Sequence, residues 1–341
     1  MPALRSPSAR RPRSVGLECG EGGTARGDSR RRSRVGPRFP VTLVDGHPGL
    51  SLPFGRALAR SVRDFDVVHV HAIWNIPTLW AVRSAVRAGV PCIVAPQGSL
   101  EPWALDAGST LRRLWADFLE WPVLRRAAAF QALSPMEECQ IRARGYEGAV
   151  HRIPNGVPCD WLEVPSIIPS SEHVSAAANR RLLFLGRLHP KKGLDLLIRG
   201  FALAVDRCPN IELVIAGHDA GSGYRIRLEE LVVEHGLQDR CRFIGEIRGA
   251  SKRACFAQAD AFALTSHSEG LPVALLEALG AGLPALLTRG CNLEEAVEVD
   301  AAIEVRTEAA SIAEGIVEMF GGARDLEAMS RRARSLVQHR F

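Results

Sequence analysis

The amino-acid sequence predicts an α/β protein in which two domains each contain a parallel sheet wrapped by helices. From about residue 40 onward, short apolar runs alternate with segments of helical spacing, such as the one around residues 76–88. Strands that read as continuous apolar runs are typical of parallel sheets buried on both faces. Their alternation with helices predicts right-handed βαβ units, so we expect two Rossmann-like domains facing across a cleft.

The expected strands form two series, separated by a polar stretch rich in proline and serine. The first series comprises residues 41–45, 67–72, 92–96 and 128–134, and the second comprises residues 181–186, 211–217, 241–245, 261–266 and 284–288. A polar, Pro/Ser-rich stretch between two such series is typical of a linker. We therefore expect a tail at 1–38, a first domain at 39–162, a linker at 163–180 and a second domain at 181–341.

The positive charge of the chain is concentrated at its start. The formal net charge is +5, from 43 basic and 38 acidic residues, and residues 1–38 alone hold ten arginines and three acidic residues. The Arg-rich segment has too few apolar residues to offset the entropy of ordering, so we expect a disordered tail without a secretory signal pattern. The rest of the chain is nearly neutral, and nothing in it favours a nucleic-acid partner.

The cysteines and the hydropathy pattern favour a cytoplasmic protein. The eight cysteines are scattered, without a C-x-x-C pair, which is typical of reduced thiols rather than of disulfides or a zinc site. No stretch approaches the ~18 consecutive apolar residues of a membrane-spanning helix. We therefore expect no structural metal ion and no membrane-spanning helix.

The most informative segment, SHSEGLPVALLEALGAGLPALLT, covers residues 266–288. It predicts a strand end near Ser266, a loop that carries Glu269, and a helix with Pro272 at its first position. The helix is apolar except for Glu277, and a helix apolar on nearly all sides is buried. A buried carboxylate needs a partner. A ribose diol offers two donors to one carboxylate, and an ion pair or a capping role is the alternative.

A second segment, LGRLHPKKGLDLLI at residues 185–198, again reads as strand, loop and helix. Arg187 and Lys192 fall in the loop at the carboxyl end of a strand, where ligands bind in open α/β sheets. Two cations there suit a diphosphate, although surface cations that are only solvated are the simpler alternative. In the first segment, Gly270 allows a ligand to approach the backbone, and the free amides at the helix start favour phosphate.

Together these segments resemble the family 4 retaining glycosyltransferases, which have the GT-B fold. The resemblance covers roughly residues 40–341 and is carried by three features. These are the G-R-L…K-K-G loop at 186–193, the E-G-L-P segment at 269–272 with a second Glu eight residues after the first, and the I-P-N-G-V turn at 153–157. The two glutamates are a specific signal because they follow the Arg/Lys loop in a strand, loop and helix setting.

The resemblance implies a role for each residue of the second-domain site. Arg187 and Lys192 are expected to hold the diphosphate, Glu277 the ribose and Glu269 the donor sugar, with the amides of Gly270 and Leu271 beside them. Glu269, Arg187 and Lys192 are then the catalytic residues. The implied reaction transfers a sugar from a nucleotide sugar with retention of anomeric configuration, and it needs neither a metal ion nor another cofactor.

The resemblance also implies a biological setting. The expected acceptor is a glycan or a lipid-linked molecule in polysaccharide or glycolipid biosynthesis, at the cytoplasmic face of the inner membrane. The stretch 109–128 places Leu111, Leu114, Trp115 and Phe118 on one helical face, flanked by arginines. Such a face can lie peripherally on an anionic membrane, but packing within its own domain is the expected role.

Residues of the first domain are candidates for the acceptor side of the cleft. His69 and His71 end an expected strand and point the same way, because strand side chains alternate. No third ligand is apparent, so a metal site is not expected. In the segment 96–105, Gln97 stands where many family members have a histidine, and an amide cannot act as a general base. In the resembled family this strand end faces the cleft, so the resemblance implies that His71 and Gln97 line it.

The sequence departs from the family's pattern at both ends of the chain. Family members open with a strand and a glycine-rich loop, whereas Gly22-Gly23 lies in the Arg-rich segment with no strand before it. Relatives also continue beyond the position of Phe341 into helices, so we expect the first strand, its loop and those helices to be missing. One alternative is a GT-B protein that binds nucleotide sugar without turnover. Another is a glycoside hydrolase that uses Glu269 and Glu277.

Overall fold

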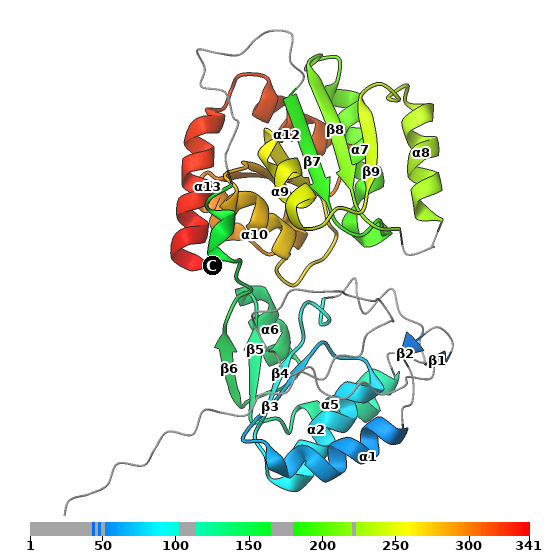
Figure 1. The fold of residues 1–341 in the computed structure, drawn as a ribbon, viewed down its shortest axis with the longest axis vertical. Coiled ribbons are helices and arrows are strands. Elements are labelled where there is room, and N and C mark those ends of the chain that lie inside the picture. Colours follow the sequence, from blue (N-terminus) through cyan, green and yellow to red (C-terminus); the bar gives the residue numbers. More distant parts are fainter. Residues whose placement is uncertain (1–42, 45–46, 49–51, 102–113, 165–179, 220–222) are drawn as a thin grey trace, which may run out of the picture. The chain divides into compact units, whose positions relative to one another are not determined.

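The computed structural model describes residues 43–44, 47–48, 52–101, 114–164, 180–219 and 223–341 (Figure 1). These residues divide into two compact units. The first unit ends at Arg152 and the second begins at Ile153, and Glu101 and Leu133–Glu137 also group with the second unit. The expected tail, the Gly22-Gly23 motif and residues 165–179 of the expected linker lie outside the described residues.

The first unit contains a four-stranded parallel sheet. Its strands lie in the order β3 (Val68–His71), β4 (Cys92–Ala95), β5 (Ala129–Ala132) and β6 (Ala149–Arg152). The sequence predicts the first three strands and misses β6, because the residues of β6 are mostly exposed and do not form an apolar run. Side chains of the central strands fill the core of this unit, and those of Val94 and Phe130 are fully buried.

A short antiparallel pair precedes this sheet in the chain. In it, β1 (Leu43–Val44) pairs with β2 (His47–Pro48). The prediction that residues 41–45 form a strand of the parallel sheet is therefore wrong. The dipeptide Asp45-Gly46 between the two strands is typical of a hairpin turn, which favours pairing of β1 with the segment that follows it.

Six helical segments are described before Ile153. They are α1 (Leu52–Ser61), η1 (Val62–Asp64), α2 (Ile76–Ala88), η2 (Ala116–Glu120), α5 (Trp121–Leu124) and α6 (Pro135–Ala143). The helix expected around residues 76–88 is confirmed as α2. It begins where the side chain of Asn75 accepts a hydrogen bond from the amide of Thr78, and it ends before Gly89. Both are common ways for a helix to begin and end.

The apolar stripe expected within 109–128 is not buried where the structure describes it. Leu114 is 49% exposed and Phe118 is 73% exposed, while Leu111 lies outside the described residues. The prediction that the stripe packs within its own domain is therefore wrong for Leu114 and Phe118. The face of this segment that packs inward instead carries Ala116 and Glu120 of the π-helical turn η2, followed by Trp121 and Leu124 of α5.

The second unit contains a six-stranded parallel sheet. Its strands lie in the order β12 (Ala302–Val305), β11 (Ala285–Thr288), β10 (Ala261–Leu264), β7 (Arg180–Leu185), β8 (Ile211–Ala216) and β9 (Cys241–Gly245). All strands predicted for this series are present, β10 ends slightly before the predicted end at Ser266, and β12 is an additional edge strand. The predicted α/β architecture with parallel sheets is confirmed in both units.

The strand order of the second sheet reverses between β7 and β10. From this point β7, β8 and β9 run toward one edge, and β10, β11 and β12 toward the other. Because βαβ crossovers are right-handed, the helices that follow β7 and β10 cover opposite faces. The neighbours β7 and β10 therefore mark a topological switch point, and in open α/β sheets ligands bind at the carboxyl ends of strands at such a point.

The helices of this unit pack in two groups. They are α7 (Leu194–Ala204), α8 (Tyr224–Glu234), α9 (Gly249–Ala257), α10 (Val273–Gly280), α11 (Glu294–Glu298), α12 (Ala309–Phe320) and α13 (Leu326–Arg340), with the short turns η3 (Cys159–Trp161), η4 (Pro190–Lys192) and η5 (Arg289–Cys291). Helix α7 packs against α8 and α12, whereas α10 packs against α13 (Figure 1).

The loops that follow β7 and β10 are hydrogen-bonded to each other. The amide of His267 donates to the carbonyl of Lys191 at 2.9 Å, and Thr265 Oγ1 donates to the carbonyl of Gly193 at 2.9 Å. Gly193 has a φ of 62°, and a Cβ there would collide with the carbonyl oxygen of Thr265. Glycine is therefore required at this position by both its backbone angle and its contact.

Gly193→Ala should lower the free energy of unfolding by more than about 1 kcal/mol, because its Cβ meets backbone at a positive φ. Chemical denaturation followed by circular dichroism measures the change. Gly280→Ala in α10 is the matched control, since its Cβ would make ordinary contacts 3.4 Å from Trp161 and 3.5 Å from Val337. The control should stay within about 1 kcal/mol of the parent. Equal stability of the two variants would contradict the constraint at Gly193.

Candidate functional site

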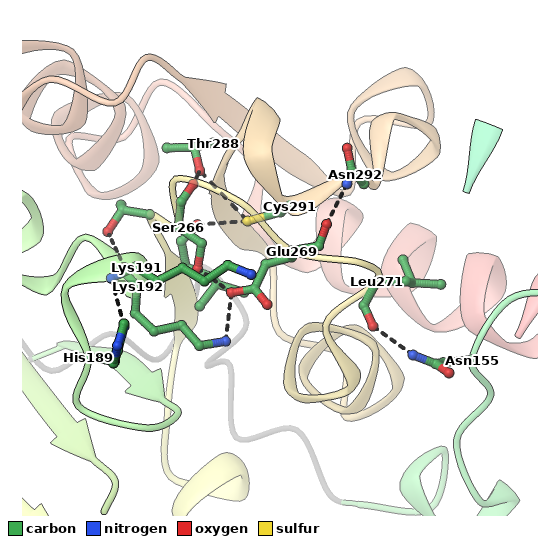
Figure 2. A network of polar contacts seen from close by, with 12 residues as sticks. Asn155, His189, Lys191, Lys192, Ser266, Glu269, Leu271, Thr288, Cys291 and Asn292 are labelled. Carbon is green, nitrogen blue, oxygen red and sulfur yellow. Dashed lines mark hydrogen bonds and ion pairs between the residues drawn. The ribbon is translucent and has the colours of Figure 1, made fainter. Parts of the chain in front are cut away.

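The loops after β7 and β10 bring Lys192 and Glu269 together. Lys192 Nζ lies 2.6 Å from Glu269 Oε1, and Ser266 Oγ donates to the same oxygen at 2.6 Å (Figure 2). The lysine and glutamate side chains are only 16% and 12% exposed. Limited access of water strengthens the attraction between the two charges, so the ion pair holds the two loops together. Two of the predicted site residues are therefore in direct contact.

Two asparagine side chains hold the backbone of the loop after β10. Asn292 Nδ2 donates to the carbonyl of Glu269 at 2.6 Å, and Asn155 Nδ2 donates to the carbonyl of Leu271 at 2.8 Å (Figure 2). Asn155 belongs to the I-P-N-G-V turn, which is the signal that points to it in the sequence. Asn292 has no such signal, although its φ of 54° marks it in the structure as a specially placed residue.

The loop after β7 is a cationic region in which Arg187 is exposed. Arg187 has no hydrogen bond or ion pair among the described residues. Burial lowers the pKa of His189, and the charges of Arg187 and two neighbouring lysines lower it further. Burial also lowers the pKa of Lys191, while the carboxylate of Glu269 opposes this shift. Arg187 is thus available to an anionic ligand at the switch point.

Glu277 is buried in α10 and is paired with a lysine from α9. Its side chain is 10% exposed, and Lys252 Nζ lies 2.7 Å from Oε1 and 2.6 Å from Oε2. An ion pair is one of the alternatives that the sequence allows for this carboxylate, and the structure contains this ion pair. Despite the close ammonium group, Oε2 has no hydrogen bond of good geometry within the described residues. Lone pairs of this oxygen are therefore available to a ligand hydroxyl.

The loop after β10 contains a second buried polar atom of this kind. Ser268 Oγ is buried without a hydrogen-bond partner among the described residues. The loop ends at Pro272, which is the N-cap of α10 rather than its first helical residue as predicted. The amides of Val273 and Ala274, the first two residues of α10, have no partner within the helix. Buried polar groups are seldom left unpaired, so Ser268 Oγ and Glu277 Oε2 favour a polar ligand here.

In the first unit, the predicted residues His71 and Gln97 are in contact. Gln97 Nε2 lies 2.9 Å from His71 Nδ1, at the carboxyl ends of β3 and β4. The rings of His69 and His71 are 4.3 Å apart, which confirms that they point the same way. Ala72, Trp74 and Gln97 all have positive φ angles. Such strained backbone clusters at functional sites.

The described residues show neither a metal cluster nor a membrane span. No group of three or more His, Cys, Asp or Glu side chains among them is placed to hold an ion. No helix among them is long and apolar enough to cross a membrane. The described cysteines are free thiols, and burial raises the pKa of Cys92, Cys241 and Cys291 to about 12. These three thiols stay protonated and pack as small apolar groups.

Two family models match the chain. The model described as glycosyl transferases group 1 matches residues 170–336, and the model described as glycosyl transferase 4-like domain matches residues 13–156. The first match contains the loops after β7 and β10 with Lys192, Glu269 and Glu277. The second match contains His71 and Gln97. Together the two matches cover most of the chain.

Related proteins are named as glycosyltransferases. The D-inositol 3-phosphate glycosyltransferase of Saccharomonospora viridis is 28% identical over 69% of this chain and 56% of its own length. The phosphatidyl-myo-inositol mannosyltransferase of Mycobacterium tuberculosis is 26% identical over 68% of this chain and 58% of its own length. The chain thus spans little more than half the length of these relatives.

Similar solved structures are also glycosyltransferases. The sucrose-phosphate synthase of Thermosynechococcus elongatus has a TM-score of 0.69 and 20% identity, over 84% of this chain and 73% of that protein. HepE of Anabaena, in complex with UDP and glucose, has a TM-score of 0.69 and 19% identity, over 85% of this chain and 77% of that protein. At these identities the likeness shows the fold alone, which is the GT-B fold.

The fold and the matched models together define the class of protein, namely the glycosyltransferases of GT-B architecture. Within this class, the chain belongs to the family 4 glycosyltransferases. The resemblance found in the sequence is therefore confirmed at the level of family and fold.

Lys192→Met should lower the free energy of unfolding by on the order of 2–3 kcal/mol, because it leaves the buried Glu269 carboxylate without its counter-charge. Urea denaturation measures the change. The double variant Lys192→Met/Glu269→Gln should recover part of the loss, since neither charge is then buried alone.

Arg225→Met is the control for this prediction. The ion pair of Arg225 with Glu229 is 42% and 45% exposed, and exposed pairs contribute less than about 1 kcal/mol. If Lys192→Met proved no more destabilising than Arg225→Met, the ion pair of Lys192 with Glu269 would not hold the loops.

Proposed function

We propose that the protein is a retaining glycosyltransferase that moves a sugar from a nucleoside diphosphate sugar to a glycan or lipid-linked acceptor. The observation that carries this proposal is the contact of the loop bearing Arg187 and Lys192 with the loop bearing Glu269, at the switch point of the second sheet. Cations suit the diphosphate of such a donor, and carboxylates suit its hydroxyl groups.

Each residue of the second unit's site has a role in donor binding. Arg187 and Lys192 neutralise the diphosphate, Glu277 accepts hydrogen bonds from the ribose, and Glu269 contacts the transferred sugar. Gly270 and Leu271 lie just before α10. Their amides and the positive end of this helix favour the phosphate groups.

The chemistry follows from the change of charge during the reaction. Negative charge grows on the diphosphate as its bond to the sugar weakens. Arg187 and Lys192 carry their charge before the reaction begins, so they stabilise the transition state more than the ground state. The diphosphate shares the ammonium group of Lys192 with Glu269, which is 2.6 Å away. Because these side chains balance the charge, the reaction needs no metal ion.

The names of related proteins support the proposed class of acceptor. Two relatives carry D-inositol 3-phosphate and phosphatidyl-myo-inositol in their names. A third, from Xanthomonas oryzae, is named GDP-mannose:cellobiosyl-diphosphopolyprenol alpha-mannosyltransferase and is 26% identical over 73% of this chain. By extension, this protein transfers sugar in polysaccharide or glycolipid biosynthesis, at the cytoplasmic face of the membrane.

A lipid-linked acceptor requires contact with the membrane, and one surface of the first unit suits this contact. Phe118 and Leu119 of η2 are 73% and 58% exposed. Arg125 and Arg126, which follow α5, are also exposed. Apolar side chains and nearby cations are typical of a surface that binds an anionic bilayer. Peripheral binding to such a bilayer through this surface is therefore part of the proposed function.

A protein that binds nucleotide sugar without turnover is the second candidate. Gln97 favours it, because an amide cannot accept a proton as a general base. This candidate has the same donor site and predicts the same nucleotide binding. Transfer to an acceptor separates the two candidates.

Nucleoside diphosphates and their sugars should raise the melting temperature of the parent selectively. A ligand at ~100 times its dissociation constant adds about 2.7 kcal/mol of stability. In thermal scans with UDP, GDP, ADP and dTDP, Glu277→Ala and Arg187→Ala should lose most of this shift. Glu269→Ala should retain nucleotide binding but transfer sugar on the order of a hundredfold more slowly. A chelator should change neither binding nor transfer.

Arg207→Ala is the control for these three variants, because Arg207 pairs with Glu314 at an exposed position of the second unit. If all three site variants bind and react like the control, the site assignment is wrong. Binding by the parent without transfer to any polyol, glycan or lipid-linked acceptor would favour the second candidate.

Leu119→Asp should reduce binding of the protein to phosphatidylglycerol vesicles several-fold, since it places a negative charge on the proposed membrane surface. Co-sedimentation with these vesicles and with neutral phosphatidylcholine vesicles measures the effect. Leu203→Asp is the control, because Leu203 is equally exposed at 58% but lies on α7 of the second unit. Equal binding by the two variants would contradict the membrane surface.

A further inference from the structure

The ionic partner of Glu277 lies outside the loops that define the donor site. Lys252 belongs to α9, and its Nζ lies within 2.7 Å of both carboxylate oxygens of Glu277. Neither the Arg/Lys loop nor the E-G-L-P segment contains it. The sequence does not point to Lys252, because a lysine in a partly exposed helix reads as a solvated surface residue.

Lys252 is held in place by an aromatic ring. Its Nζ lies 5.4 Å from the ring centroid of Trp161 in η3, within the range of a cation–π contact. The guanidinium of Arg253 lies 5.8 Å from the same ring, and Arg253 is also paired with Asp160. The Lys252 side chain is only 22% exposed, so its ammonium group is confined between the indole and Glu277.

Trp161 is itself fixed by the core of the second unit. It is 5% exposed, and its ring meets that of Phe256 edge to face at a centroid distance of 5.1 Å. Phe256 is fully buried and stacks at 5.9 Å on Phe262 of β10. The indole is therefore a rigid support, and the position of Lys252 is set by the packed core rather than by solvent.

The contact leaves room for a ligand on the carboxylate. An ionised carboxylate can accept about four hydrogen bonds, and a single ammonium group uses only part of this capacity. Oε2 of Glu277 is buried without a well-formed hydrogen bond among the described residues. With the ammonium group of Lys252 on one side, the remaining lone pairs of the two oxygens can accept hydrogen bonds from two ligand hydroxyls.

We propose that Lys252, supported by Trp161, is a positioning residue that holds Glu277 for the 2′,3′-diol of the donor ribose. The inference rests on the proposed function, because it concerns the same donor site. The inference adds a residue that determines specificity. The preference for a nucleotide with an intact diol would depend on Lys252, which does not belong to the donor-site loops.

The test compares nucleotides that differ only in the diol. Isothermal titration calorimetry measures the affinities of UDP, GDP and the 2′,3′-dideoxy form of each, with inorganic pyrophosphate as a probe for the diphosphate subsite alone. For the parent, UDP or GDP should bind more tightly than its dideoxy form. In Lys252→Met this preference should fall roughly tenfold, which corresponds to about 1.4 kcal/mol. Affinities for the dideoxy nucleotide and for pyrophosphate should stay those of the parent.

Three further variants distinguish positioning from general damage to the fold. Lys252→Arg keeps the charge and should keep most of the preference for the diol. Trp161→Phe keeps an aromatic ring and should lose less of the preference than Lys252→Met. Glu277→Gln should abolish the preference, and adding Lys252→Met to it should then have no further effect, because residues that act through one another are not additive.

The outcomes separate this inference from the function on which it rests. A parent that binds none of UDP, GDP, ADP, dTDP and pyrophosphate overturns the proposed function and the inference with it. A parent that prefers the diol, with Lys252→Met showing the same preference, overturns the inference alone. Tighter binding of UDP or GDP by Lys252→Met also overturns it, since Lys252 would then compete with the ribose. Equal losses for diol and dideoxy nucleotides would indicate a structural role only.

Discussion

The ion pair between Lys192 and Glu269 ties together the two loops at the switch point of the second sheet, and the geometry of the candidate site depends on it. Each residue comes from a different βα unit, and the two residues are 77 positions apart in the sequence. The same loops are joined by the contact of Gly193 with the backbone of Thr265. An ion pair and a close backbone contact therefore join the same two loops. Together they hold the lysines of the loop after β7 beside the carboxylate of the loop after β10.

The two acidic residues of the site share a physical arrangement. Glu269 is paired with Lys192, and Glu277 is paired with Lys252, in both cases with little exposure to water. Buried carboxylates are stable only with such partners. Each carboxylate also has hydrogen-bonding capacity that one ammonium group does not fill, so a ligand with several hydroxyl groups can bind without displacing the cation. Each glutamate can therefore keep its lysine partner and bind a ligand hydroxyl at the same time.

The proposed function rests on this site more than on the fold. The GT-B fold and membership of family 4 follow from the comparisons, but a fold supports many reactions. What restricts the reaction class is a cationic loop beside carboxylates at the place where parallel sheets bind ligands. The contact of His71 with Gln97, amid strained backbone, marks a second polar region at the equivalent edge of the first sheet.

The sequence by itself determined the parallel-sheet architecture and the donor-site candidates, because buried strands form apolar runs and loops after such strands carry functional residues. It did not reveal the edge strand β6, whose residues are mostly exposed, and it placed residues 41–45 in the parallel sheet, whereas β1 pairs antiparallel with β2. It also wrongly predicted that the stripe at Leu114 and Phe118 packs inside, whereas the buried side chains of this segment are those of Ala116, Glu120, Trp121 and Leu124. Only the tertiary structure decided the partners of Glu269 and Glu277. Those partners come from other elements of the fold, and contacts between distant segments depend on packing that local sequence patterns do not encode.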